Sequence, residues 1–173
     1  MPPNDFDHFK QVPAILDIEA SGFGKGAYPI EIGCVLHDGR TYCTLIYPEL
    51  DWTAWSSEAE KIHGIKREAL FVAGKPAQMV ARELNELLHG ITLFSDGWPY
   101  DYGWLNLLYE AADMTPSFKL DALQKLLNEE QIDHWLDAVT HSQHVLAIQR
   151  HRASSDARIQ QHALVGMLGM PLV

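Results

Sequence analysis

Two acidic residues interrupt an otherwise apolar run near the start of the chain, and this run constrains the fold more than any other feature. The run from Val12 to Ala20 has the length and composition of a buried β-strand, and it carries Asp17 and Glu19. Residues two apart in a strand point to the same face, so the two carboxylates project side by side. Like charges this close repel one another unless a cation lies between them, and burial raises the cost. The run therefore predicts either a metal site or a strand end where two acids meet solvent.

The elements expected around this strand define an α/β chain. Apolar segments at 28–36 and 40–47 flank Asp38-Gly39, which predicts a hairpin with a two-residue turn. The later elements are expected to be short helices and loops at 48–74, a helix from Pro76 to about 90, a strand at 91–95, and helices at 101–112, 120–127, 132–149 and 155–168. Strands first, and then strands alternating with helices, predict a mixed central β-sheet flanked by helices, in a single domain at 1–173.

The size and charge of the chain narrow the functions that it can have. Its 173 residues carry a net charge of −10, whereas long duplexes are bound through clustered Lys and Arg. A short footprint, such as a strand end or a short oligonucleotide, is favoured instead. No apolar run approaches the ~20 residues of a membrane span, and the polar start from Met1 to Lys10 does not resemble a signal peptide. We therefore expect a cytoplasmic protein with no membrane partner, and the oligomeric state, a homodimer included, stays open.

Two further segments place an acid where a helix is expected to begin. Asp101 follows the last short apolar strand after a turn containing Gly and Pro, and ligands of open α/β sheets gather at the carboxyl ends of strands. Asp156 falls in the first turn of the final helix, where negative charge is favoured and Ser154 or Ser155 can cap the helix. His151 lies just before this helix, and an imidazole can take a proton from water near neutral pH. Taken singly, these residues are better explained as helix-end acids and a surface histidine.

Taken together, the three segments resemble the DEDDh branch of the RNase T/DnaQ-like 3′–5′ exonuclease family. The matching segments are Asp17-Ile18-Glu19 for D-x-E, Pro29 to Gly33 for its usual continuation, Ile62-His63-Gly64-Ile65 for the family's Ile-His-Gly-Ile, and His151 to Ala157 for H-x-A-x-x-D-A. Each motif is short, but they occur in order and at suitable separations from about Ala14 to Leu168. The resemblance implies an RNase H-like fold and a hydrolase that removes nucleotides from the 3′ end of single-stranded DNA or RNA.

The resemblance also implies a role for each acid and for the histidine. Asp17 bridges two divalent cations, Glu19 and Asp156 help to hold the ion that activates water, and Asp101 acts on the second ion. His151 is the general base that takes the proton from the attacking water. Oxygen ligands suit Mg²⁺ or Mn²⁺ better than zinc, which favours His and Cys. The expected cofactor is therefore two ions of Mg²⁺ or Mn²⁺.

One motif departs from the family pattern. The second motif of the family commonly begins with His-Asn and runs on to Phe-Asp, whereas this chain has Asp96-Gly97 followed by Tyr100-Asp101. Asp96 is a rival carboxylate, but it occupies the position of the family's His, so the metal is assigned to Asp101. The loss of the His-Asn pair changes the contacts expected near the end of the substrate.

Several residues are candidates for binding the terminal nucleotide. Phe23, in the loop after Glu19, and Trp98 or Tyr100, in the turn before Asp101, can stack on bases without regard to sequence. The resemblance adds Ala20 and His63 as pocket residues. Trp98 is equally explained by core packing.

Three arginines near His151 also have two interpretations. Arg150, Arg152 and Arg158 can contact phosphates, or they can form a solvated basic face.

Two other functions remain open beside the exonuclease. The altered second motif allows a binding module on the same fold whose catalytic site has degraded, although all four acids and the histidine are retained. The negative charge leaves room for an enzyme that hydrolyses dinucleotides or very short oligonucleotides. The choice between ribose and deoxyribose depends on pocket detail that the pattern does not contain.

The two cysteines flank the predicted hairpin turn. Counting outward from a two-residue turn places Cys34 directly opposite Cys43, so a cross-strand disulfide is geometrically conceivable. In a cytosolic chain the pattern favours two reduced thiols.

Overall fold

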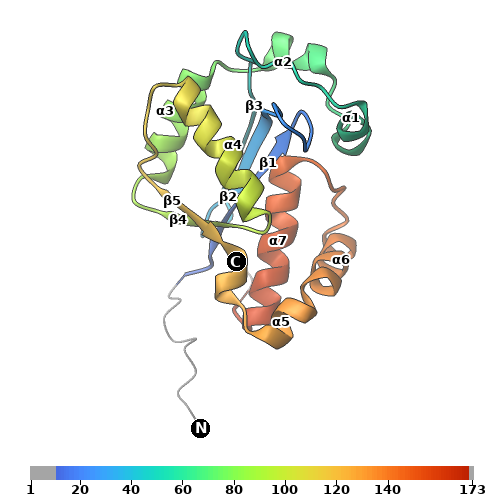
Figure 1. Cartoon of the computed structure of the whole chain (residues 1–173). Coiled ribbons are helices and arrows are strands. Elements are labelled where there is room, and N and C mark those ends of the chain that lie inside the picture. The colour runs from blue at the N-terminus through green and yellow to red at the C-terminus, as the bar shows by residue number, and fades with distance from the viewer. Residues whose placement is uncertain (1–10, 172–173) are drawn as a thin grey trace.

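A computed structural model describes residues 11–171, which form a five-stranded sheet with helices on both faces (Figure 1). The strands are β1 (Ala14–Ala20), β2 (Pro29–Val35), β3 (Thr41–Leu45), β4 (Thr92–Ser95) and β5 (Lys119–Ala122). The α-helices are α1 (Ser57–His63), α2 (Arg67–Ala73), α3 (Ala77–Leu88), α4 (Trp98–Ala111), α5 (Glu129–Asp133), α6 (Trp135–Leu146) and α7 (Ala153–Leu168). The segment from Met1 to Lys10, in which we expect no signal peptide, lies outside the described residues.

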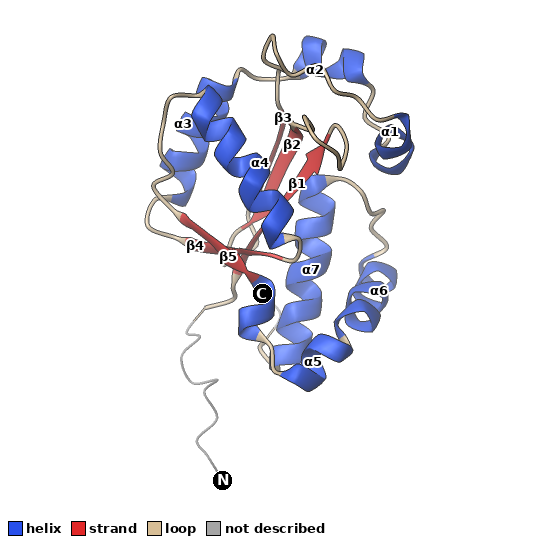
Figure 2. Ribbon diagram, viewed as in Figure 1, coloured by secondary structure: helices blue, strands red, loops and turns tan. Residues whose placement is uncertain are grey.

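The sheet has the strand order β3-β2-β1-β4-β5, with β1 at its centre. The pairs β1–β2 and β2–β3 are antiparallel, whereas β1–β4 and β4–β5 are parallel. Figure 2 shows helices α3 and α4 on one side of this sheet and α7 on the other. The predicted fold class, a mixed sheet flanked by helices, is confirmed.

The two faces of β1 contact two different hydrophobic clusters. Leu16 and Ile18 belong to the cluster that includes α3 and α4, whereas Ile15 belongs to the cluster that includes α6 and α7. Because strand residues alternate between faces, Asp17 and Glu19 share the face of Ile15. The two acids therefore point towards α7.

The hairpin between β2 and β3 differs from the prediction by one residue. Val35 pairs with Thr41, and the Leu36 N–H donates to the Arg40 carbonyl, so the loop contains three residues rather than two. Gly39 ends the loop with φ +81°, a left-handed conformation that glycine adopts without a steric penalty and that is common in three-residue hairpins.

This change in register separates the two cysteines. Cys34 pairs with Tyr42, and Cys43 pairs with Gly33, so the cysteine side chains point to opposite faces. Cys34 is buried, Cys43 is exposed, and both are free thiols. The expectation that they lie directly opposite each other is wrong.

The prediction of a helix at 120–127 is also wrong. Its first residues belong to β5, which pairs with the edge of β4, and a 3-10 turn follows at Leu123–Leu126. A short apolar run does not distinguish strand from helix by its periodicity, and here the free edge of β4 selects the strand.

The remaining helices form where expected, but with shifted ends. Helix α4 begins at Trp98, three residues before the predicted start, because Pro99 is accommodated in its first turn. Pro76 precedes α3 as its N-cap instead of opening it. The helix predicted at 132–149 is divided into α5 and α6, and Ala147 ends α6 in a left-handed conformation.

A close approach between β2 and α7 fixes the distance between the sheet and this helix. A Cβ atom built at Gly33 would lie 2.3 Å from the backbone nitrogen of Ser154 and 2.6 Å from the carbonyl carbon of Ala153. Only glycine allows this approach, since the neighbouring atoms belong to the backbone. Gly33 pairs with Asp17 across the sheet, so the start of α7 lies beside the acidic pair of β1.

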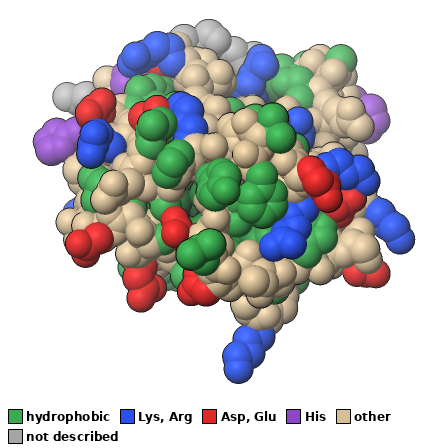
Figure 3. Space-filling view, turned by 90° about the horizontal axis from the view of Figure 1, so that it is seen from above, with side chains coloured by type: hydrophobic (Ala, Val, Ile, Leu, Met, Phe, Trp, Pro, Cys, Tyr) green, Lys and Arg blue, Asp and Glu red, His purple; other side chains and the backbone are tan. Residues whose placement is uncertain are grey.

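The face seen from above in Figure 3 carries hydrophobic side chains near its middle, with acidic and basic side chains interspersed around them. Among the described helices, none is long and apolar enough to cross a membrane.

Candidate metal centre and active site

Three of the predicted metal ligands meet between β1 and α7. Asp17, Glu19 and Asp156 each offer a carboxylate oxygen, and these oxygens all lie within 4.8 Å of one another. Burial, followed by the charges of nearby carboxylates, raises the pKa of Asp17 well above its ordinary value. Burial and the charge of Asp156 raise the pKa of Glu19 to about 7. A cluster of buried carboxylates with raised pKa values is stabilised by a cation, and an all-oxygen donor set fits Mg²⁺ or Mn²⁺.

Asp101 lies beside this cluster but outside its closest group. It occupies the first turn of α4, is 4% exposed, and accepts a hydrogen bond from the Ser95 hydroxyl. Burial raises the pKa of Asp101 to about 7, and its charge contributes to the raised pKa of Asp17. The contact with Ser95 therefore holds Asp101 at the end of β4, close enough to Asp17 for its charge to act there.

The rival carboxylate, Asp96, is engaged elsewhere. Its Oδ1 atom accepts a hydrogen bond of 2.8 Å from the side-chain nitrogen of Gln124, which follows β5. This contact supports the assignment of the metal to Asp101 rather than Asp96.

Residues of the loop before α7 contact both carboxylate oxygens of Asp156. Arg150 Nε lies 3.2 Å from Oδ1, and the backbone N–H of His151 donates to Oδ2 at 2.5 Å. His151 is exposed and has φ +69°, a left-handed conformation that is uncommon for a residue with a side chain. Such strain occurs at functional sites when surrounding contacts stabilise it, and the hydrogen bond to Asp156 is one such contact.

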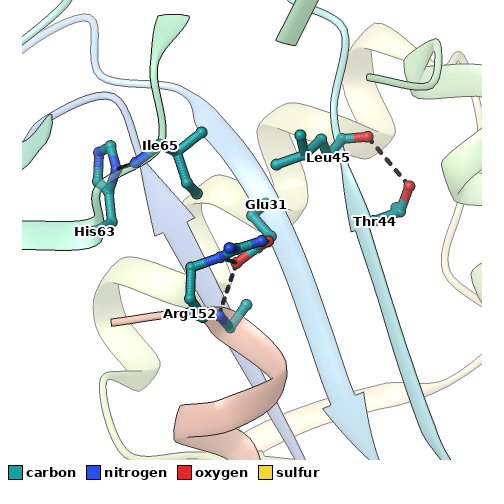
Figure 4. A network of polar contacts seen from close by, with 7 residues as sticks. Glu31, Thr44, Leu45, His63, Ile65 and Arg152 are labelled. Atoms are coloured by element: carbon teal, nitrogen blue, oxygen red, sulfur yellow. Dashed lines mark hydrogen bonds and ion pairs between the residues drawn. The ribbon is translucent and has the colours of Figure 1, made fainter. Parts of the chain in front are cut away.

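Glu31 is a buried acid that the sequence analysis assigned no role. It lies on β2 opposite Glu19, is 1% exposed, and binds Arg152 through Nε at 3.0 Å and Nη2 at 2.5 Å (Figure 4). Its second oxygen accepts the backbone N–H of Ala153 at 2.9 Å. Glu31 therefore caps α7 from the sheet, and the expectation that Ser154 or Ser155 caps it is wrong, because the helix begins at Ala153. An acid inside the otherwise apolar strand at 29–35 was the signal available in the sequence.

Gln160 is a second residue that the sequence analysis did not identify. It lies one helical turn after Asp156 on α7, is 6% exposed, and donates to Asp17 Oδ1 at 3.3 Å. Its own carbonyl oxygen is buried and has no hydrogen-bond partner among the described residues. A glutamine on a helix face gives no signal in the sequence until the sheet beneath it is known.

The residues expected to bind the terminal nucleotide lie in different environments. Phe23 is 70% exposed and lines a pocket of about 380 Å³ with Trp55 and Ser56, whereas Ala20 is buried at the end of β1. His63 is 6% exposed; its Nδ1 atom accepts the Ile65 N–H, so the proton lies on Nε2, which has no partner within the described chain. These positions leave the binding roles of the three residues as predictions.

Trp98 and Tyr100 occupy the first turn of α4 rather than a turn before it. The indole of Trp98 stacks on Tyr102 with ring centroids 5.1 Å apart and donates to the Leu120 carbonyl at 3.1 Å. Trp98 is half-buried and contacts β5, and its role in binding a base stays a prediction. Tyr100 is 59% exposed and remains available for stacking.

The three arginines do not form one basic face. Arg150 contacts Asp156, and Arg152 contacts Glu31. Arg158 instead lines a hollow with Leu146 and Gln161. The structure therefore places two of the three arginines at the acidic site.

Comparisons with known proteins identify a family and a shared fold. The model of the RNase_T exonuclease family matches residues 14–163. Among solved structures, Escherichia coli Exonuclease I in complex with a dA16 oligonucleotide has a TM-score of 0.67 at 13% identity, over 88% of this chain and 40% of that one. Exonuclease I from Methylocaldum szegediense has a TM-score of 0.62 at 14% identity, over 88% and 39%. The Mopeia virus exonuclease domain, partially complexed with manganese, has a TM-score of 0.52 at 16% identity, over 93% and 80%. Comparison with curated proteins finds no match.

The chain thus belongs to the RNase_T exonuclease family, as the sequence motifs predict. At these identities the solved structures share the fold, which is that of the RNase H-like exonucleases. The chain spans about 40% of the length of the Exonuclease I chains that it matches.

Proposed function

We propose that this chain is a 3′–5′ exonuclease that hydrolyses phosphodiester bonds at the 3′ end of single-stranded nucleic acid. The observation that carries the proposal is the meeting of Asp17, Glu19 and Asp156 within 4.8 Å, with Asp101 fixed beside them, on the fold of an exonuclease family. The E. coli relative that binds dA16 supports a single-stranded substrate.

The acids and the histidine would divide the chemistry between them. Two divalent ions, Mg²⁺ or Mn²⁺, held by Asp17, Glu19, Asp101 and Asp156 would stabilise the attacking and leaving oxygens of an in-line displacement. His151 takes a proton from water, and the water oxygen bonds to phosphorus as the bond to the 3′ oxygen breaks. The hydrogen bond between the His151 backbone and Asp156 keeps the backbone of this residue next to the acidic cluster.

The neighbouring pocket fits a terminal nucleotide. Phe23 presents an exposed ring beside about 380 Å³ of space, and base stacking on such a ring contributes ~1–3 kcal/mol. His63 has a buried Nε2–H with no partner among the described residues, and the family resemblance makes it a candidate donor to the substrate. Stacking tolerates any base, so this pocket supports a nuclease without sequence preference.

A degradation time course tests the proposal. 5′-labelled single-stranded DNA and RNA of equal length are incubated with Mg²⁺, Mn²⁺ or chelator, and the same is done for Asp156→Asn. Asp137→Asn, which changes an exposed acid on α6, is the matched control. A ladder that shortens from the 3′ end, and that both chelator and Asp156→Asn abolish, is the expected result.

The same assay separates the other functions. If neither polymer is cleaved but a dinucleotide is, the enzyme acts on short products. If no substrate is cleaved and calorimetry detects no divalent ion at the acidic cluster, the chain is a binding module and the proposal fails.

A further inference from the structure

Arg150 and the candidate metal cluster share the carboxylate of Asp156. Both oxygens of Asp156 are engaged by the loop before α7, Oδ1 by the Arg150 side chain and Oδ2 by the His151 backbone. Asp156 is also one of the three acids whose oxygens converge within 4.8 Å. An ion held by this cluster therefore meets a carboxylate that already has a cationic partner, the Arg150 guanidinium.

The two arginines of the loop differ in how firmly they are held. Arg152 makes several hydrogen bonds to Glu31, whose side chain is 1% exposed, so this contact anchors the loop to β2. Arg150 reaches Asp156 through its Nε atom alone, at 3.2 Å, and its side chain is 35% exposed. A single, partly solvated contact is the easier one to exchange.

We propose that Arg150 is an internal counter-cation that competes with the divalent metal ion for Asp156, and that its release supplies a phosphate-binding group to the substrate. This inference rests on the proposed function. The guanidinium leaves Asp156 when an ion takes Oδ1, but the Arg152–Glu31 anchor keeps the loop, and hence Arg150, beside the acidic cluster. A free guanidinium at this place pairs with a phosphate through two parallel N–H donors. Metal binding and substrate binding then support each other.

Arg150→Gln should tighten the binding of Mn²⁺ and weaken the binding of single-stranded DNA. Removing the competitor should tighten Mn²⁺ binding about three- to tenfold, because the metal no longer displaces a charged partner. Removing the phosphate contact should raise KM for single-stranded DNA about tenfold, with a smaller effect on kcat. If Arg150 only stabilises the loop, Arg150→Gln should weaken the binding of both Mn²⁺ and single-stranded DNA.

Arg158→Gln is the matched control, since it also removes one positive charge from the start of α7, but from a side chain that lines a different hollow. Mn²⁺ affinity is measured by titration calorimetry on the full chain for wild type, Arg150→Gln, Arg158→Gln and Asp156→Asn. Arg150→Lys keeps the charge without the forked geometry, and it should bind Mn²⁺ more tightly than wild type and less tightly than Arg150→Gln.

The outcomes separate this inference from the proposed function. In one outcome, the wild-type protein binds Mn²⁺ and degrades DNA while Arg150→Gln binds Mn²⁺ no more tightly than Arg158→Gln does. That result refutes the competition and leaves the proposed exonuclease activity standing. If Arg150→Gln does not fold, an Mn²⁺ affinity in Arg150→Lys equal to that of wild type also refutes it. Wild-type protein that binds no Mn²⁺ at Asp156 overturns both.

Discussion

Gly33→Ala tests whether the contact between β2 and α7 sets the geometry of the acidic site. The added methyl group would lie 2.3 Å from the Ser154 nitrogen, 2.6 Å from the Ala153 carbonyl carbon and 2.8 Å from the Ser154 Cα atom. Ordinary contacts between such atoms lie near ~3.5 Å, so the start of α7 has to move by about 1 Å. All three atoms belong to the backbone, and no side-chain rotation can relieve the overlap.

This displacement has a cost in stability and a larger cost in activity. Overpacking of this kind destabilises by ~1–3 kcal/mol, and the upper end applies because the helix must move as a unit. For a chain of this size, about 3 kcal/mol corresponds to a Tm about 6–12 °C lower. Asp156 lies in the first turn of α7, and a misplacement of ~1 Å can lower turnover ~10²-fold.

Gly166→Ala is the matched control on the same helix. A Cβ atom at Gly166 has no neighbouring atom within 4 Å, and alanine favours the helix by ~0.5–1 kcal/mol over glycine. Thermal melting and the rate of oligonucleotide shortening are measured for both variants. A Gly33→Ala protein with the Tm and turnover of wild type would show that α7 is not held at this distance by the glycine.

Four further predictions follow from the contacts of the site. In chelator, the free energy of unfolding should fall as the pH rises from about 4.5 through about 7, because the raised pKa of Glu19 makes the folded chain bind more protons than the unfolded chain in this range. Urea unfolding at pH 5 and 8 measures this difference, and equal stability at the two pH values contradicts the prediction. His151→Ala should lower turnover ~10²–10⁴-fold while calorimetry finds nearly unchanged metal affinity, and full activity would remove its role as base. Glu31→Gln should lower stability by about 1–3 kcal/mol, since Arg152 loses its partner but can reach solvent, and an unchanged Tm argues against the anchor. Alkylation of the native chain should modify Cys43 and spare Cys34, and oxidant should form no disulfide between them; mass spectrometry of the folded chain decides this.

The acidic site could be predicted from the sequence because its residues carry signals that do not depend on their neighbours. Asp17 and Glu19 stand out as acids in an apolar strand, and His151 and Asp156 belong to one short motif. Glu31 carries the same kind of signal in β2, but its role depends on the location of Arg152, 121 residues later in the chain. Gln160 gave no signal at all, because a polar residue on a helix is usually solvated.

The errors in the fold arise where a tertiary contact decides between local alternatives. The hairpin at Asp38-Gly39 can close with two or three loop residues, and that choice moves Cys43 to the other face of the sheet. The segment at 120–127 becomes a strand because β4 offers a free edge at Thr92–Ser95. Local patterns contain no information about either neighbour.

Strand β2 contributes no predicted metal ligand, but it controls the distance between the elements that do, β1 and α7. β1 supplies Asp17 and Glu19, α7 supplies Asp156, and β2 lies beside β1 while contacting the start of α7. Gly33 allows the helix to approach, and Glu31 binds both the first N–H of the helix and Arg152. Because Glu31 also lies opposite Glu19, its charge would destabilise the acidic cluster if Arg152 did not pair with it. One ion pair therefore attaches the loop that carries His151 to the sheet and offsets a charge that would otherwise weaken the site.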